Sequence, residues 1–403
     1  MVRGPHNGGN PWKRGASPAH SLHKMLSRPG SMPPAMARHF IREYTSSGDL
    51  VLDPFCGKGT VLLEAAILRR RAIGFDIAPD AVLVADAKIN PPSRRAIKSF
   101  LDSVPPLSSR ARGAPWQIKT FFSPKTLRQL LGARNYLLGA AANGHRGRRK
   151  TANFLLGTLL GILHGHSKLS LSLPCSHSFA MAPNYVRTYA REAGLRRPSR
   201  DVKKCLQTRV DQLLEDGSPK TRGRAHVLLA EQAHTLKPFM RTEFVDLIIT
   251  SPPYLNVQTY AKDSWLRFWL LKQEHKELRK KFIETGSPKL YLEKMKPCLV
   301  SMLRILKPLH YAVIVAGDAP YIRGGKKRYF RTATRLGKLG RGLNEGGYTF
   351  RVVETIRDSI PSYARYYSAV HKDGKKNNGD DGRKGVRVER ILVLRKVKCR
   401  RRA

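Results

Sequence analysis

The sequence predicts an α/β fold in which a mainly parallel sheet is closed by an antiparallel hairpin and interrupted by a mainly helical insertion. Between residues 35 and 88, short apolar runs alternate with helical patterns, as in βαβ units. A glycine-rich turn directly follows the first apolar run, at a place where open α/β sheets bind ligands. Further apolar runs after residue 225 extend the same sheet.

The composition indicates a folded protein with a polyanionic partner. The chain has 403 residues, 41% of them hydrophobic, which is enough to bury a core in two or three structural units. Its 75 Lys and Arg against 29 Asp and Glu give a net charge of +46, which favours nucleic acid first and an anionic membrane surface second. Basic residues interrupt every long apolar stretch, so we expect no transmembrane helix. The first residues lack the apolar core of a secretory signal, so we expect a cytoplasmic protein.

The cysteines predict neither a disulfide framework nor a metal site. They are odd in number, lie far apart and form no Cys-x-x-Cys motif, which fits a reducing compartment. They are Cys56, Cys175, Cys205, Cys298 and Cys399. His164 and His166 have no ligand partners at metal-site spacing, so we expect no bound metal.

The amino-terminal part predicts an arm followed by a βαβ unit. Residues 1–22 are rich in Gly, Pro and Asn at first and predict a flexible basic arm. A helix is then expected over 35–44, a strand from Leu50, a helix over 61–68, a strand over 71–76 and a helix over 81–88. The crossover between the two strands is expected to be right-handed.

Residues 90–224 predict the helical insertion. Proline pairs at 91–92 and 105–106 break the pattern, and helical periodicity returns over four later segments. These segments are 126–142, 151–163, 185–193 and 201–214. The region also contains basic clusters, such as residues 145–150.

The sheet resumes after the insertion, so residues 23–89 and 225–403 are expected to form one domain. Strands are expected over 225–229, 245–250 and 311–315. Two late strands, 350–356 and 388–394, are expected to pair as an antiparallel hairpin. The polar, glycine-rich stretch 372–385 between them predicts a mobile loop.

The turn after the first strand has the chemistry of a ligand loop. Gly57 and Gly59 lack Cβ atoms, which lets the backbone approach a ligand closely. Asp53 ends the strand and can meet a cation, while the helix that begins near Thr60 offers N–H groups to an anion. Because Lys58 is followed by glycine rather than by Ser or Thr, the turn is not a phosphate-binding P-loop. Alone, it could equally be a structural turn.

Two further features complete this candidate site. Asp76 ends the second strand, where a carboxylate can accept hydrogen bonds from ribose hydroxyls. After the apolar run 245–249 come Thr250, Ser251, Pro252, Pro253 and Tyr254. The two prolines fix φ and remove N–H donors, so this loop is stiff. Without the first turn, it would read as an ordinary polyproline turn.

The two motifs together resemble the amino-methyltransferases that use S-adenosylmethionine to modify the exocyclic nitrogen of a DNA base. The resemblance implies a Rossmann-like class I methyltransferase sheet and S-adenosylmethionine as cofactor. It implies cofactor contacts at Asp53, Pro54, Phe55, Cys56, Gly57, Gly59, Thr60 and Asp76, with Glu231 near the adenine and Lys24 and Ser31 near the methionine end.

The resemblance also assigns catalysis to the Ser-Pro-Pro-Tyr loop. An exocyclic amine is a poor nucleophile because its lone pair is delocalised into the ring. Ser251 Oγ and the Pro252 carbonyl would accept its N–H groups, in a loop stiffened by Pro253. Tyr254 would stack on the target base after it flips out of the duplex.

The expected function is site-specific methylation of cytosine N4 in double-stranded DNA, because Ser-Pro-Pro-Tyr is commonest in enzymes of that type. The alternatives are an adenine-N6 DNA methyltransferase, an RNA base methyltransferase and an inactive nucleic-acid-binding protein. A restriction-modification role would make a cognate restriction endonuclease a partner.

Other segments are candidates for contact with the nucleic acid. Residues 323–341 are expected to form a basic loop along the phosphate backbone, and the insertion is expected to recognise the target sequence. Asn256, Gln258 and Tyr260 could read bases or pack as a polar loop, and Asp318 is expected to be a turn residue.

Overall fold

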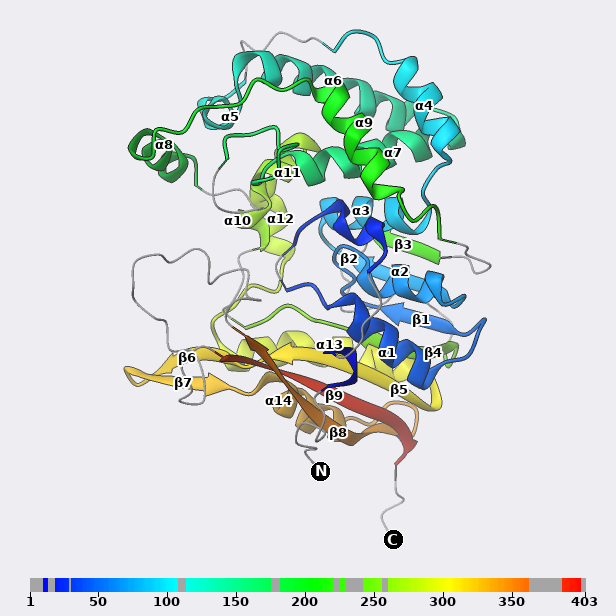
Figure 1. The fold of residues 1–403 in the computed structure, drawn as a ribbon. Helices are drawn as coiled ribbons and strands as arrows, with labels where there is room; N and C mark the ends of the chain where they lie inside the picture. The colour runs from blue at the N-terminus through cyan, green and yellow to red at the C-terminus, as the bar shows by residue number, and fades with distance from the viewer. Residues whose placement is uncertain are drawn as a thin grey trace.

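The computed structural model of the protein describes residues 10–13, 19–28, 30–107, 114–174, 182–219, 225–229, 242–255, 260–361 and 386–399. Its centre is a seven-stranded sheet in the order β3-β2-β1-β4-β5-β9-β8 (Figure 1). The strands are β1 (Leu50–Asp53), β2 (Arg71–Asp76), β3 (Ala225–Leu229), β4 (Val245–Thr250), β5 (Leu306–Gly317), β8 (Tyr348–Pro361) and β9 (Val386–Lys398). The first five run parallel, and β9 is antiparallel to both β5 and β8. The structure confirms the predicted Rossmann-like sheet and its antiparallel hairpin.

Both faces of the sheet are buried, which explains the nearly continuous apolar runs of its central strands. Val51 and Val313 pack into one hydrophobic cluster with α1 (Pro34–Tyr44) and α2 (Thr60–Ile67). Leu52 and Ile314, their neighbours along the chain, pack into another cluster with α13 (Pro288–Ile305) and α14 (Thr332–Arg341). Alternate residues thus face opposite layers, as the pleat of a strand requires.

The strand order reverses at β1, and this places the candidate site. From β1 the chain moves outward to β2 and β3, then returns to β4 and β5 on the other side of β1. The turns after β1 and β4 therefore lie next to each other at the carboxyl edge of the sheet. This is the place at which open α/β sheets form a ligand crevice.

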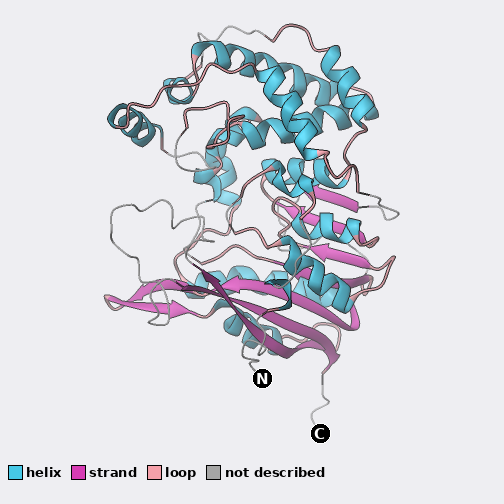
Figure 2. Ribbon diagram, viewed as in Figure 1, coloured by secondary structure: helices cyan, strands magenta, loops and turns pink. Residues whose placement is uncertain are grey.

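Helices occupy the insertion, as predicted, and form a layer of their own beyond α3 (Pro79–Ile89) (Figure 2). They are α4 (Arg94–Asp102), α5 (Trp116–Phe121), α6 (Pro124–Asn143), α7 (Arg146–Ile162), α8 (Pro183–Glu192) and α9 (Val202–Leu213). The sequence did not indicate α4 or α5. The hydrophobic cluster of the insertion also takes in Val84 and Ala87 of α3 and Met25 of the short 3-10 helix η2 (Ser21–Met25), so the insertion is packed onto these two helices.

The described residues of the amino-terminal arm are packed against the rest of the protein. Residues 10–13 include a short 3-10 helix, η1 (Pro11–Lys13), that packs beside β8. The Asn10 amide donates to Asp358 Oδ1 at 2.8 Å, and the Trp12 indole donates to Asp358 Oδ2 at 3.2 Å. Both donor residues are buried, and η2 is mostly buried as well. Composition suggested an arm, but one buried carboxylate holds the segment in place; residues 1–9 and 14–18 lie outside the described residues.

The segment 323–341 is a hairpin arm and a helix rather than a loop. Strand β6 (Ala319–Arg323) pairs antiparallel with β7 (Lys326–Phe330), and α14 follows. Gly324 and Gly325 both have positive φ, 56° and 70°, in the two-residue connection. Such a turn matches the twist of paired strands, and only its two glycines signalled it in the sequence.

Three short helices, α10 (Tyr260–Asp263), α11 (Trp265–Leu270) and α12 (His275–Lys281), follow the loop after β4. Of the helices in the described ranges, none has the length and apolar character needed to cross a lipid bilayer. Within the same ranges, the His, Cys, Asp and Glu side chains form no group of three that could hold a metal ion.

Two glycines in helices of the insertion allow a test of how closely α7 packs on η2. A Cβ added at Gly161 of α7 would lie 1.8 Å from the Met25 carbonyl oxygen, whereas one added at Gly139 of α6 would meet nothing within 4 Å. We expect Gly161→Ala to lower the free energy of unfolding by about 1–3 kcal/mol through overpacking. Gly139→Ala should raise it by up to about 1 kcal/mol, since alanine favours helix. Urea denaturation measures both; equal stability of the two variants would contradict the packing of η2 on α7.

Candidate active site

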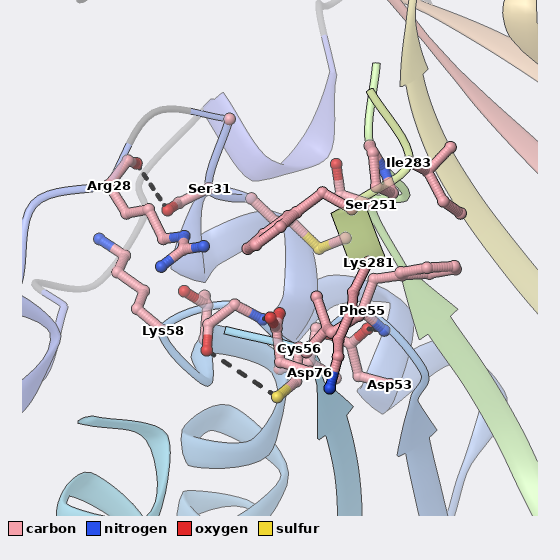
Figure 3. Close-up of a pocket in the computed structure, with 18 residues that line it drawn as sticks. Arg28, Ser31, Asp53, Phe55, Cys56, Lys58, Asp76, Ser251, Lys281 and Ile283 are labelled. Carbon is pink, nitrogen blue, oxygen red and sulfur yellow. Dashed lines mark hydrogen bonds between the residues drawn. The ribbon is translucent and has the colours of Figure 1, made fainter. Parts of the chain in front are cut away.

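A pocket opens at the carboxyl edge of the sheet, where the turns after β1 and β4 meet (Figure 3). It holds about 860 Å³ of empty space, including the part open to solvent. Its walls come from the segment before α1, the glycine-rich turn, the end of β2, the loop after β4 and the chain that follows α12. Five stretches that are far apart in sequence thus meet around one cavity.

Asp53 joins the two turns at the floor of the pocket. Thr250 Oγ1, at the end of β4, donates to Asp53 Oδ1 at 2.7 Å, and the Phe55 N–H donates to the same oxygen at 3.1 Å. The pKa of Asp53 is raised to about 7, chiefly because the side chain is buried and to a lesser extent because of the negative charge of Asp76. A cation in the pocket would favour the ionised form of Asp53.

Asp76 holds the glycine-rich turn in shape from the end of β2. Its Oδ2 accepts from the Gly57 N–H at 2.8 Å, and its Oδ1 accepts from the Ala78 N–H at 2.9 Å. Burial raises the pKa of this carboxyl too. Asp76 also lines the pocket, and a carboxylate has lone pairs left for a ligand hydroxyl.

The two glycines of the turn serve different purposes. Gly57 has φ +49° and lines the pocket, as the sequence suggested. Gly59 has φ +71°, but a Cβ there would lie 2.7 Å from the Cβ of Ala85 in α3. The missing side chain of Gly59 therefore allows helix packing rather than approach to a ligand, and Gly59 does not line the pocket. Phe55, Cys56 and Thr60 do line it, while Pro54 is buried behind them.

Basic side chains face the acidic floor, and sequence reasoning did not assign them a role. Figure 3 shows Arg28 and Lys58 on one side of the pocket and Ser251 and Ile283 on the other. Burial lowers the pKa of Lys58 to about 8, so a ligand anion would stabilise its charged form. Lys281, at the end of α12, is exposed and also lines the pocket. The pocket can therefore hold a group that carries charges of both signs.

Apolar side chains complete the walls around these charges. Phe55 and Ile77 come from the first two strand ends, and Met32 comes from the segment before α1. Phe282 and Ile283 come from beyond α12. Nothing in the sequence distinguished residues 281–283 from other exposed helix ends. Such walls suit a flat apolar ring beside the charged part of a ligand.

A buried carboxylate fixes the segment that forms one wall. Glu64 of α2 accepts from Arg38 Nε at 2.7 Å and lies 2.8 Å from His23 Nε2. Burial lowers the pKa of His23 to about 4, so this imidazole is neutral at pH 7. Ser31 lines the pocket and donates to the Arg28 carbonyl at 2.8 Å. The Lys24 side chain is exposed and does not line the pocket, so its predicted cofactor contact is wrong.

The loop after β4 reaches the pocket through two of its four predicted catalytic residues. Ser251 and Pro253 line the cavity, while Pro252 is buried. Tyr254 is 5% exposed and absent from the pocket wall. Its hydroxyl donates to Glu389 Oε1 of β9 at 3.0 Å, and Ser251 Oγ donates to the Tyr254 hydroxyl at 3.4 Å. The predicted stacking face of Tyr254 is therefore turned into the core, because its hydroxyl has a buried acceptor there.

The described structure does not place some of the predicted residues at the pocket. Glu231, Asn256 and Gln258 lie outside the described residues, and Tyr260 begins α10 without a described side chain. Asp318 forms an ion pair with Arg390 at 2.8 Å and does not line the pocket, as expected of a turn residue.

Comparison with known proteins adds a family match to this geometry. Residues 6–86 match the DNA methylase family N6_N4_Mtase. The type II methyltransferase M.MjaII of Methanocaldococcus jannaschii is 29% identical over 82 residues, 20% of this chain and 15% of that protein. A tRNA (guanine(10)-N2)-dimethyltransferase of Methanothermobacter thermautotrophicus is 46% identical over 50 residues, 12% of this chain and 15% of that protein. The matched segments thus span well under a quarter of these two relatives.

Solved structures resemble the chain only distantly. A SAM-dependent methyltransferase of Methanosarcina mazei gives a TM-score of 0.32 at 10% identity, over 89% of this chain and 98% of that one. The fold assignment therefore rests on the strand order itself. The matched residues 6–86 contain α1, β1, the glycine-rich turn and β2, and so include the turn and the strand end that line the pocket.

Proposed function

We propose that the protein transfers a methyl group from S-adenosylmethionine to the exocyclic N4 amine of a cytosine in double-stranded DNA. The observation that carries the proposal is that Asp53, Asp76 and Ser251 line one pocket. A donor held by the turn after β1 would then face an acceptor held by the loop after β4. The family match of residues 6–86 and the net charge of +46 support DNA as the partner.

The pocket residues fit the chemical groups of S-adenosylmethionine. Asp53 would accept from the α-ammonium, while Lys58 and Arg28 would face the carboxylate. Asp76 would accept from the ribose hydroxyls, and the apolar walls would enclose the adenine. The Thr60 hydroxyl is buried and has no hydrogen-bond partner among the described residues, which indicates a polar group awaiting a ligand. The bound cofactor would supply an electrophilic methyl group.

The loop after β4 would prepare the acceptor amine. The Ser251 hydroxyl donates toward Tyr254, whose own hydroxyl donates to Glu389, so the lone pairs of Ser251 Oγ stay available to accept an amine N–H. The Pro252 carbonyl would accept the second N–H. These two hydrogen bonds would favour a pyramidal nitrogen whose lone pair points at the methyl group. Tyr254 then acts as a positioning residue for Ser251, and the methylated nitrogen loses its extra proton to water.

The choice of cytosine rests on the Ser-Pro-Pro-Tyr sequence, and adenine N6 is the nearest alternative in DNA. A second candidate is the exocyclic N2 of guanine in RNA, which the identity with tRNA (guanine(10)-N2)-dimethyltransferases favours. All three acceptors are exocyclic amines, so the same loop chemistry serves each. Target recognition by residues 90–224, a cognate restriction endonuclease and a cytoplasmic location remain predictions from the sequence.

Product analysis tests the proposal directly. Purified protein is incubated with methyl-labelled S-adenosylmethionine and either unmethylated plasmid DNA or total tRNA, and the digested nucleosides are separated. We expect the label in N4-methyldeoxycytidine. Label in N6-methyldeoxyadenosine would change the target base, and label only in N2-methylguanosine of tRNA would replace the proposal by the RNA alternative. Mapping the methylated positions in the plasmid then gives the recognised site.

Two variants should separate cofactor binding from methyl transfer. We expect Ser251→Ala to leave the affinity for S-adenosylhomocysteine unchanged while turnover falls about a hundredfold, the size of effect seen when one preorganised group is lost. Asp53→Asn should weaken that affinity about tenfold, because a charged partner of the ammonium is lost. Calorimetry and single-turnover rates measure both, with Ser218→Ala, an exposed serine outside the pocket, as control. Normal turnover of Ser251→Ala would remove Ser251 from the mechanism.

The same Asp53→Asn variant should be more stable than the wild type at neutral pH. Asp53 has a pKa raised to about 7 in the fold, but it ionises near pH 4 when unfolded, so the folded chain binds the extra proton between these values. The free energy of unfolding of the wild type therefore falls as the pH rises from about 4 to about 7. Asparagine does not ionise, so the variant does not lose stability in this way. The stability advantage of the variant should grow by up to about 4 kcal/mol between pH 4 and pH 8. An advantage that does not change with pH would show that Asp53 ionises normally.

A further inference from the structure

The β6–β7 hairpin projects from the same edge of the sheet that carries the Ser-Pro-Pro-Tyr loop. Thr250, the last residue of β4, pairs with Ile314 of β5. β5 ends at Gly317, and β6 begins two residues later. Figures 1 and 2 show the hairpin extending outward beyond the body of the sheet. The strand that neighbours the proposed catalytic loop therefore leads directly into this hairpin.

The base of the hairpin is anchored firmly. Ala319 and Phe330, which pair with each other, are buried in the same hydrophobic cluster as α13 and α14. Asp318 forms a bidentate ion pair with Arg390 of β9, with oxygen–nitrogen distances of 2.8 to 3.1 Å. Thr332 donates to the Gly317 carbonyl at 2.8 Å just beyond the second strand. The arm thus starts from a fixed position relative to β5.

The outer part of the hairpin exposes an apolar face. Ile322, next to the last residue of β6, is 77% exposed, and Tyr329 is 37% exposed. The register pairs Pro320 with Tyr329 and Ile322 with Lys327, so three apolar residues, Pro320, Ile322 and Tyr329, share one face of the two-stranded ladder with Lys327. An aliphatic side chain this exposed buries little apolar surface and so contributes little to the stability of the fold. A partner that buries it would gain apolar contact.

The other face and the base of the arm are basic. Lys326 and Arg328 alternate with Tyr329 along β7, and both are exposed, as is Arg331 just after the strand. Residues 319–331 contain no Asp or Glu. An exposed apolar side chain between positive charges suits a polyanion with an apolar interior. Duplex DNA has that chemistry, with phosphates outside and stacked bases inside.

We propose that the β6–β7 hairpin is a wedge that enters duplex DNA beside the target base pair, with Ile322 occupying the stack as the target base leaves it. Lys326 and Arg328 hold the phosphates on either side. The inference rests on the proposed function, because extrusion is needed only if the amine lies in a duplex. Aliphatic side chains inserted at base steps unstack them, which lowers the barrier to extrusion. Ile322 is thus a positioning residue that acts on the DNA rather than on the methyl donor.

A paired and a mismatched substrate test the wedge. Short duplexes carry the site found by mapping, with the target base either paired or opposite a non-complementary base, and single-turnover methylation is measured on each. A mismatched base is already loosely held and needs little help to leave the stack. We expect Ile322→Ala to slow methylation of the paired duplex about tenfold or more, equal to about 1.4 kcal/mol of barrier, and that of the mismatched duplex less than about twofold.

Leu309→Ala is the matched control, since Leu309 is 58% exposed near the opposite end of β5. It should leave both rates unchanged, and normal methylation of the mismatched duplex by Ile322→Ala shows that this variant is folded. Equal slowing on both duplexes would overturn the wedge in favour of simple DNA holding. Unchanged rates on both would also overturn it and would leave the apolar face to a protein partner. Failure of the wild type on every DNA would instead refute the proposed function.

Discussion

One hydrogen bond, from Thr250 to Asp53, joins the two halves of the sheet where the site lies. The strand order reverses at β1, and β1 and β4 are paired in parallel, so the turns that follow them lie side by side. The 2.7 Å contact ties the last residue of β4 to the last residue of β1. It also buries a carboxylate whose pKa rises to about 7. The pocket therefore has a fixed floor with an acidic group that is poised to change charge.

The buried ionisable side chains around this floor lower the free energy of unfolding when they are charged. Asp53 and Asp76 have raised pKa values and Lys58 has a lowered one, so each is less readily charged in the pocket than in water. A ligand with an ammonium and a carboxylate would restore these charges and stabilise the fold. By contrast, Glu64 is buried with two partners, Arg38 and His23, and serves the structure alone.

Local patterns in the sequence predicted the sheet and half of the pocket, because continuous apolar runs and glycine turns are properties of neighbouring residues. The rest depends on contacts between distant segments. Lys281 and Phe282 reach the pocket only through the path of α10 to α12, and no local signal marks them. Tyr254 was misplaced because its buried acceptor, Glu389, is remote in the chain. Gly59 was predicted to let a ligand approach the backbone, but its missing side chain makes room for Ala85 of α3 instead.

The segment from Ser21 to Arg28 connects the insertion with the pocket, because it contacts helices of the insertion at one end and lines the pocket at the other. Ser21 Oγ donates to the Leu213 carbonyl of α9 at 2.8 Å, and Gly161 of α7 lies against the Met25 carbonyl. A few residues later, Arg28 forms part of the pocket wall. A rigid-body rotation of the insertion would therefore pull on that wall. A movement of the helical layer would thus reach the cavity through the backbone of residues 21–28.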